Sequence, residues 1–114
     1  MAGYLTTHVL DTARGRPAEG LRITLYRIDG EERKAVTGAV TNADGRTNAP
    51  ILPESDWAQG TYELVFSAGD WLREQGLEGG FLGEVPIRFT LSEDSHYHVP
   101  LLLSPFGYST YRGS

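Results

Sequence analysis

Cysteine is absent from this chain of 114 residues, which excludes disulfide bonds, thiol nucleophiles and thiolate metal ligands. No apolar run approaches the ~20 residues that a membrane-spanning helix needs. The N-terminal segment also lacks the basic and apolar regions of a secretory signal. We therefore expect a cytoplasmic protein that has no membrane partner.

An excess of positive charge is missing as well. Lys and Arg number 10 against 15 Asp and Glu, which gives a formal net charge of −5. This balance argues against nucleic acid or an anionic membrane surface as a partner. Hydrophobic residues at 39% and charged residues at 22% are ordinary for a globular chain, and the length predicts a single domain over residues 1–114.

The chain is rich in turn residues and in short alternating segments. Alternation predicts strands over 4–11, 21–28, 35–41, 61–67, 85–91, 97–103 and 108–114, with a further short strand beginning at 46. Residues 70–76 are the only helical candidate, with Asp70 as the expected cap and Gly76 at the expected end. Seven to eight short strands and one short helix predict an all-β, antiparallel β-sandwich.

The strand expected over 97–103 separates into two unlike faces. Its core face carries Tyr97, Val99, Leu101 and Leu103. His98 lies on the other face with His96, Pro100 and Leu102. Spacing alone favours a solvated histidine there, but an apolar outer face indicates an interface. A partly desolvated His98 at such an interface is suited to act as a general base near neutral pH.

Further candidates lie near the N-terminus and after a tight turn. His8 on the first strand and His96 beside a turn are, taken alone, a structural and a surface histidine. Arg46 follows Asp44-Gly45 and is, by default, solvated. Its functional alternative is a guanidinium fork that binds a planar anion through two hydrogen bonds.

The C-terminal segment is unusually rich in hydrogen-bonding groups. Tyr111 offers a flat ring and a phenol, and Arg112 is a second candidate for binding an anion. Ser109 and Thr110 point to opposite faces of a strand, so only one of them reaches a given site.

Two other chemistries fit less well. His96 and His98 with His8 form a possible zinc-ligand set. A Ser-His-Asp triad lacks both a nucleophile elbow and an evident orienting carboxylate.

Three motifs, in this order, resemble those of the transthyretin-related 5-hydroxyisourate hydrolases. They are Leu5-Thr6-Thr7-His8-Val9-Leu10-Asp11 with Gly15-Arg16-Pro17-Ala18, then Thr41-Asn42-Ala43-Asp44-Gly45-Arg46-Thr47, and finally the run from His96 to Ser114 that ends in Tyr-Arg-Gly-Ser. The resemblance covers nearly the whole chain, with no departure at a motif position.

The resemblance implies a transthyretin-like sandwich that hydrolyses 5-hydroxyisourate to 2-oxo-4-hydroxy-4-carboxy-5-ureidoimidazoline in urate degradation, without metal or cofactor. It implies a homotetramer, a dimer of dimers, with sites in channels between dimers. The expected catalytic residues are His8, Arg46 and His98, with either histidine as the base. The expected substrate-binding residues are His8, Arg46, Ser109, Tyr111, Arg112 and Ser114.

Two rival functions use the same fold, because fold does not fix function. One is a non-catalytic, transthyretin-like carrier of a small ligand, whose channel we expect to be lined with apolar and neutral groups. The other is an adhesion or carbohydrate-binding sandwich, which has no need of the basic set His8, Arg46 and His98.

Overall fold

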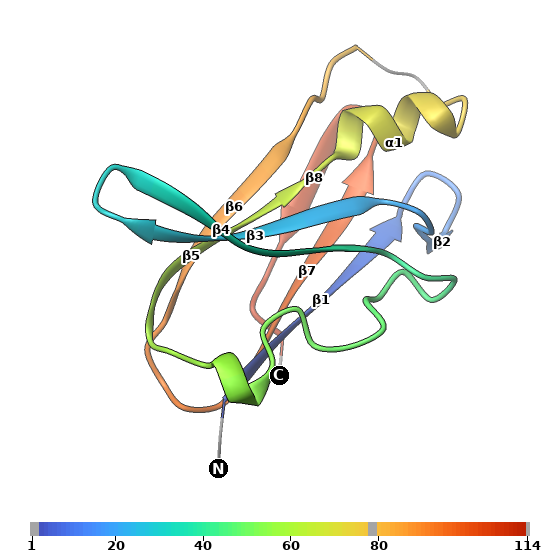
Figure 1. The fold of residues 1–114 in the computed structure, drawn as a ribbon. Coiled ribbons are helices and arrows are strands. Elements are labelled where there is room, and N and C mark those ends of the chain that lie inside the picture. The colour runs from blue at the N-terminus through green and yellow to red at the C-terminus, as the bar shows by residue number, and fades with distance from the viewer. Residues whose placement is uncertain (1–2, 78–79, 114) are drawn as a thin grey trace.

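Two four-stranded sheets pack face to face in the computed structural model, which describes residues 3–77 and 80–113 (Figure 1). One sheet has the order β2-β1-β7-β8, from strands β1 (Tyr4–Asp11), β2 (Arg16–Pro17), β7 (His96–Ser104) and β8 (Gly107–Thr110). The other has the order β4-β3-β5-β6, from strands β3 (Arg22–Asp29), β4 (Glu32–Val40), β5 (Gly60–Phe66) and β6 (Val85–Leu91). A 3-10 turn, η1 (Glu54–Asp56), precedes β5, and helix α1 (Ala68–Glu74) follows it.

The core lies between the sheets and is built from alternate residues of each strand. The fully buried side chains include Leu5, Val9, Leu21, Ile23, Leu25, Tyr62, Leu64, Phe66, Leu91, Leu101 and Leu103. Full burial of one such side chain is worth roughly 1.5–3 kcal/mol, so this alternation fixes which face of each strand turns inward. The outward face of β1 consequently carries Tyr4, Thr6, His8 and Leu10, all half-buried.

The predicted sandwich is confirmed, but one strand pair differs from the prediction. β1 and β7 run parallel, with Thr6 opposite His98 and His8 opposite Pro100. Every other strand pair is antiparallel. No hairpin joins β1 to β7, so nothing local forces these two strands to run in opposite directions.

Helix α1 begins earlier than the sequence predicts. Its N-cap is Ser67, and Asp70 lies in its first turn, so the expected cap was wrong. The expected end is confirmed, because Gly76 follows the C-cap Gln75 with a φ of +72°.

Several expected strand limits also change. β8 stops at Thr110 instead of reaching 114, although Gly113 still forms a bridge to His98. No strand begins at Arg46, which makes only an isolated bridge to His8. The two-residue strand β2 lies between the strands expected at 4–11 and 21–28, where no strand is predicted.

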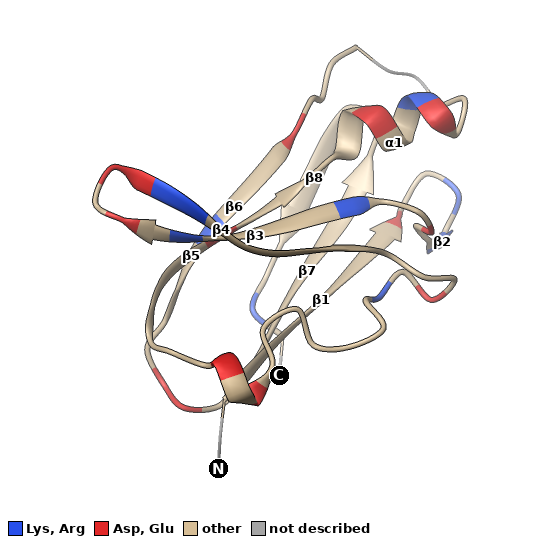
Figure 2. Cartoon of the chain, viewed as in Figure 1, with Lys and Arg blue, Asp and Glu red and all other residues tan. Residues whose placement is uncertain are grey.

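Charged residues gather at the hairpin tips and on helix α1, and the middle of β1 and all of β7 carry none (Figure 2). In the part of the chain that the structure describes, no helix is long and apolar enough to cross a membrane.

Candidate functional site

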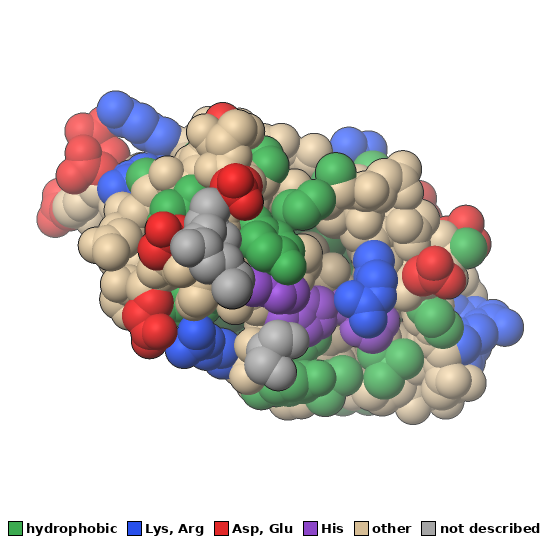
Figure 3. Space-filling view, turned by 90° about the horizontal axis from the view of Figure 1, so that it is seen from below, with side chains coloured by type: hydrophobic (Ala, Val, Ile, Leu, Met, Phe, Trp, Pro, Cys, Tyr) green, Lys and Arg blue, Asp and Glu red, His purple; other side chains and the backbone are tan. Residues whose placement is uncertain are grey.

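The histidines gather on the outer face of the β2-β1-β7-β8 sheet, where a space-filling view shows them side by side among apolar side chains (Figure 3). Their closeness follows from the parallel register of β1 and β7. The ring centroids of His8 and His98 are 6.2 Å apart, and those of His96 and His98 are 6.3 Å apart. The sheet therefore brings together both histidines that the sequence predicts to be catalytic.

Arg46 reaches the same cluster through a tight turn. The Asn42 side-chain oxygen accepts hydrogen bonds from the backbone N–H of Asp44 (2.9 Å) and of Arg46 (3.2 Å). Gly45 has a φ of +74°, and a Cβ at this position would lie 2.4 Å from the Val9 carbonyl oxygen. Only glycine fits this close approach, which presses the turn against β1 and sets Arg46 beside His8.

Burial and positive charge act together on the two predicted bases. Burial is the first cause that lowers the pKa of His98 below its usual 6.5, followed by the charges of Arg46, His8 and His96. Burial, and then Arg46, also lowers the pKa of His8. Both imidazoles are therefore neutral at pH 7 and able to accept a proton.

His96 belongs to this cluster, although the sequence predicts a surface role for it. Its ring is half-buried and stacks on Tyr4, with ring centroids 4.1 Å apart and planes 5° apart. The Thr6 Oγ1 lies 2.7 Å from His96 Nε2 and 2.8 Å from His98 Nδ1. The surface interpretation of His96 was wrong. The His-x-His spacing indicates the shared face, but Thr6 enters only through the parallel pairing.

The C-terminal segment borders the cluster along β7. The Gly113 N–H donates to the His98 carbonyl oxygen at 2.7 Å, and a Cβ on Gly113 would lie 2.9 Å from His98 Cδ2. Tyr111 is exposed beside this stretch. Ser109 pairs with Leu102 and so lies on the histidine face, whereas the Thr110 hydroxyl donates to the Pro100 carbonyl oxygen.

Arg112 points to the opposite side of the sheet. Its guanidinium carbon lies 4.0 Å from the ring centroid of Tyr97, which is a core-face residue, and its Nη1 lies 4.0 Å from Glu93 Oε1. Within one chain Arg112 is therefore not beside His98, and its role in binding substrate stays a prediction. Ser114 lies outside the described residues.

The remaining features carry little chemistry. Within 3–77 and 80–113, no group of three His, Asp or Glu side chains has the geometry to hold a metal ion.

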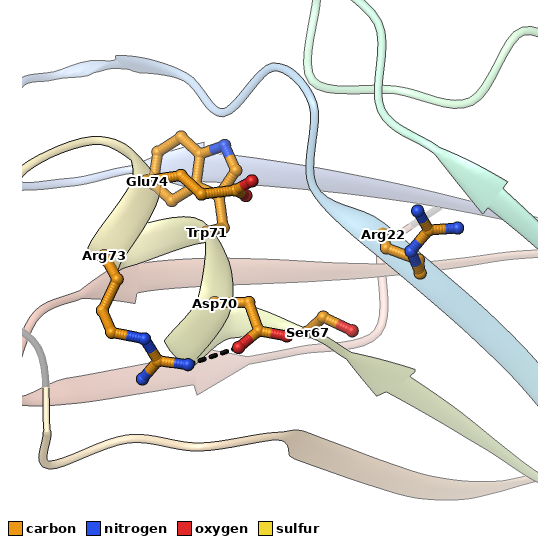
Figure 4. A pocket seen from close by; sticks show the side chains of 6 residues that line it. All are labelled: Arg22, Ser67, Asp70, Trp71, Arg73 and Glu74. Atoms are coloured by element: carbon orange, nitrogen blue, oxygen red, sulfur yellow. Dashed lines mark hydrogen bonds and ion pairs between the residues drawn. The ribbon is translucent and has the colours of Figure 1, made fainter.

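A separate depression beside helix α1 is lined by Arg22, Ser67, Asp70, Trp71, Arg73 and Glu74 (Figure 4). Its main polar contact is an exposed Arg73–Asp70 ion pair one helical turn apart, which is a solvated surface feature.

Comparison with known proteins finds relatives of two kinds, 5-hydroxyisourate hydrolases and a transthyretin. A 5-hydroxyisourate hydrolase of Mesorhizobium japonicum is 60% identical over 115 residues, which cover 98% of this chain and 93% of that protein. The structure of Klebsiella pneumoniae 5-hydroxyisourate hydrolase superposes with a TM-score of 0.84 at 37% identity, over the full length of both chains. Sea bream transthyretin, in complex with thyroxine, gives a TM-score of 0.87 at 25% identity, over 96% of this chain and 93% of that one.

The family model described as HIUase/Transthyretin family matches residues 5–113. This span contains the first two motifs, all of the third except its last residue, and the side chains of His8, Arg46, His96 and His98. The chain therefore belongs to the HIUase/Transthyretin family.

Proposed function

We propose that this protein is an enzyme that hydrolyses 5-hydroxyisourate in urate degradation. The observation that carries the proposal is the set of two half-buried histidines, with lowered pKa values, beside the guanidinium-bearing turn at Arg46. The relatives named 5-hydroxyisourate hydrolase, at 60% and 37% identity, support the substrate.

The reaction opens a cyclic amide-type bond by attack of water. It needs a base for the water, a cation or hydrogen-bond donors for the developing oxyanion, and a proton for the leaving nitrogen. His8 and His98 offer the first and the last of these, with one as the base and the other as the orienting or relaying group. Arg46 offers a planar donor fork for the electron-rich ring and its developing charge. The proposed chemistry uses no metal or cofactor.

The proposed substrate pocket extends from this cluster to the C-terminal segment. Ser109 lies on the histidine face of the same chain, and Tyr111 is exposed just after β8, where it lines the gap beside β6. Arg112 and Ser114 complete the predicted pocket, and we propose that a second copy of the chain brings its own terminus close enough to contribute.

The proposed assembly is a homotetramer, a dimer of dimers, and the lateral edges of both sheets support it. β6 and β8 each form one edge of their sheet, and the gap beside these two strands is lined in part by Ile87, Phe89 and Val99. Unpaired edges next to apolar surface favour pairing with another chain. The outer face that carries His98 also carries the half-exposed Leu10 and Leu102, which a second dimer would cover.

Removal of the last four residues tests the proposed contribution of the terminus. We expect a chain ending at Thr110 to lose most of its activity, whereas an N-terminal tag is expected to be tolerated. Light scattering, run in parallel, separates the two causes: activity lost from an intact tetramer means a damaged pocket, and loss of both means a damaged interface. A truncated chain that stays fully active would contradict the assignment of Tyr111, Arg112 and Ser114.

The alternative function is that of a small-ligand carrier. The structural similarity to sea bream transthyretin, which binds thyroxine in its structure, favours this alternative. The set His8, Arg46 and His98 favours catalysis, because a carrier of apolar ligands gains nothing from neutral bases beside a guanidinium. The deciding experiment follows the absorbance of freshly made 5-hydroxyisourate with and without protein. Decay that is faster in proportion to enzyme concentration supports the hydrolase, and decay unchanged by protein contradicts it. The cytoplasmic location stays a prediction that cell fractionation tests.

A further inference from the structure

Thr6 joins two imidazoles through a single hydroxyl. Its Oγ1 is within hydrogen-bond distance of both His96 Nε2 (2.7 Å) and His98 Nδ1 (2.8 Å). A threonine hydroxyl has one hydrogen to donate and two lone pairs. It can therefore donate to only one of the two nitrogens, so the other bond requires an imidazole N–H that donates to Thr6.

The surroundings of His98 decide the direction of this chain of bonds. Because Nδ1 of His98 is hydrogen-bonded to Thr6, Nε2 is the ring nitrogen that can interact with other groups of the site. Among the charges that act on the ring, that of Arg46 has the largest effect. A guanidinium only donates hydrogen bonds, and its charge favours a lone pair over an N–H at Nε2. A neutral His98 with a lone pair at Nε2 carries its proton on Nδ1 and donates it to Thr6, and the Thr6 hydroxyl then donates to His96.

The two imidazole rings at the ends of this series of hydrogen bonds are both held in place. His96 is fixed by its stack on Tyr4. The His98 ring lies against Gly113, where the absence of a Cβ leaves room for it. The titratable or charged groups acting on His98 are Arg46, His8 and His96, and no carboxylate is among them.

We propose that Thr6 and His96 are positioning residues that hold His98 in the Nδ1–H tautomer and thereby make its Nε2 the base that activates water. This inference rests on the proposed hydrolase function. It selects His98 over His8 as the base, a choice that the sequence leaves open.

The proposed step is balanced in atoms and charge. One O–H bond of water breaks, its proton moves to His98 Nε2, and the water oxygen bonds to the ring carbonyl carbon of the substrate. When the C–N bond opens, the same proton passes to the leaving nitrogen. In between, His98 is positive beside Arg46, and its Nδ1–H bond to Thr6 strengthens because a charged donor makes the stronger bond. Thr6, whose hydroxyl donates to a ring nitrogen of His96, thus takes the part that a carboxylate takes in hydrolytic triads.

Substitutions at Thr6 separate the hydroxyl from the shape of the side chain. Thr6→Val keeps the β-branched shape and removes the hydroxyl, so we expect kcat to fall about 10- to 100-fold while KM changes less than about threefold. Thr6→Ser restores the hydroxyl and is expected to stay within about threefold of the wild type. Thr7→Val is the matched control, because the Thr7 hydroxyl donates to the Val99 carbonyl oxygen on the core side and does not contact the cluster.

His96→Phe keeps an aromatic ring to stack on Tyr4 and removes the acceptor nitrogen. We expect a loss in kcat of the same order as in Thr6→Val. If the two residues act as one unit, the double variant is no slower than Thr6→Val alone. Fully additive losses, or a Thr6→Val enzyme with the turnover of the wild type, would overturn the inference.

The tautomer itself is measured by nitrogen NMR on labelled histidine in the folded protein at pH 7.5. We expect His98 of the wild type to carry its proton on Nδ1, and Thr6→Val to shift the population toward the Nε2–H form. A wild-type His98 protonated on Nε2 would overturn the inference whatever the rates. A wild type that does not hydrolyse 5-hydroxyisourate contradicts the proposed function instead, whereas an active wild type matched by Thr6→Val contradicts only the role of Thr6 and His96.

Discussion

The two outer faces of the sandwich carry ionisable groups in opposite ways. On the outer face of the β4-β3-β5-β6 sheet, the largely buried carboxylate of Glu63 accepts hydrogen bonds from Arg33 and Arg88, both at 3.1 Å. On the outer face of the β2-β1-β7-β8 sheet, the charged neighbours of His98 are all cationic or basic. The same architecture thus supports one face with paired charges and another with bases that lack a carboxylate partner.

The two faces differ in whether their ionisable groups can exchange a proton. The charges around Glu63 are satisfied by their partners, so they hold three strands together and leave no group free to exchange a proton. His8 and His98 are partly desolvated beside Arg46, which lowers their pKa values and keeps them neutral and basic at pH 7. Partly buried histidines without a carboxylate partner do not stabilise the fold in the way that paired charges do. Their presence on this face therefore indicates a functional site.

The largest expected effect comes from breaking the histidine face. We expect His98→Ala and Arg46→Ala each to lower kcat/KM on the order of 10²-fold or more, which is typical for the loss of a general base or an oxyanion donor. Arg88→Ala is the matched control, since it removes an arginine from the other outer face. Circular dichroism checks folding, and two folded variants with wild-type turnover would show that the site is assigned wrongly.

A smaller effect is expected from crowding the same face without removing a functional group. Gly113→Ala sets a Cβ 2.9 Å from His98 Cδ2, so the ring must move. We expect kcat to fall about 10-fold, because a small displacement of a catalytic group costs rate steeply. Gly107→Ala is the control, since the nearest atom to its Cβ is Ser104 Oγ at 3.8 Å. Equal rates for the two variants would mean that the position of His98 is not critical.

The smallest effect on activity is expected from the opposite face. Glu63→Gln removes the charge that pairs with Arg33 and Arg88, both of which are substantially exposed to solvent. We expect the free energy of unfolding to fall by about 1 kcal/mol and kcat/KM to stay unchanged. Denaturant titration and the hydrolysis assay measure the two quantities. A loss of activity as large as that of His98→Ala would remove the contrast between the faces.

Much of the fold follows from the sequence because alternation is a local property. The strands expected at 4–11 and 85–91 appear with those limits, since their apolar residues alternate and turn residues bound them. The predicted helix cap failed because Ser67 and Asp70 are both capping residue types three positions apart. The parallel pairing of β1 with β7 depends on contacts about ninety residues apart in sequence, which no local pattern encodes.

The candidate site divides in the same way. The resemblance to the hydrolase motifs indicates His8, Arg46 and His98, which residue type and spacing alone leave as structural or solvated, and the structure brings the three together. Thr6 and His96 were missed as members of the cluster, because their connection depends on the register between two distant strands. The opposite orientation of Arg112 depends on its stacking over Tyr97, which the sequence does not reveal.

The pH dependence of kcat/KM, compared between the wild type and His98→Gln, tests the central claim most directly. A histidine base must be neutral, and burial with Arg46 lowers the pKa of His98 below 6.5. The wild-type rate is therefore expected to be level above about pH 6.5 and to fall with a one-proton slope below it. The residual rate of His98→Gln is expected to lack that fall. A wild-type rate that stays flat down to the pH at which the protein unfolds, or a His98→Gln enzyme that keeps the wild-type profile, would contradict the account.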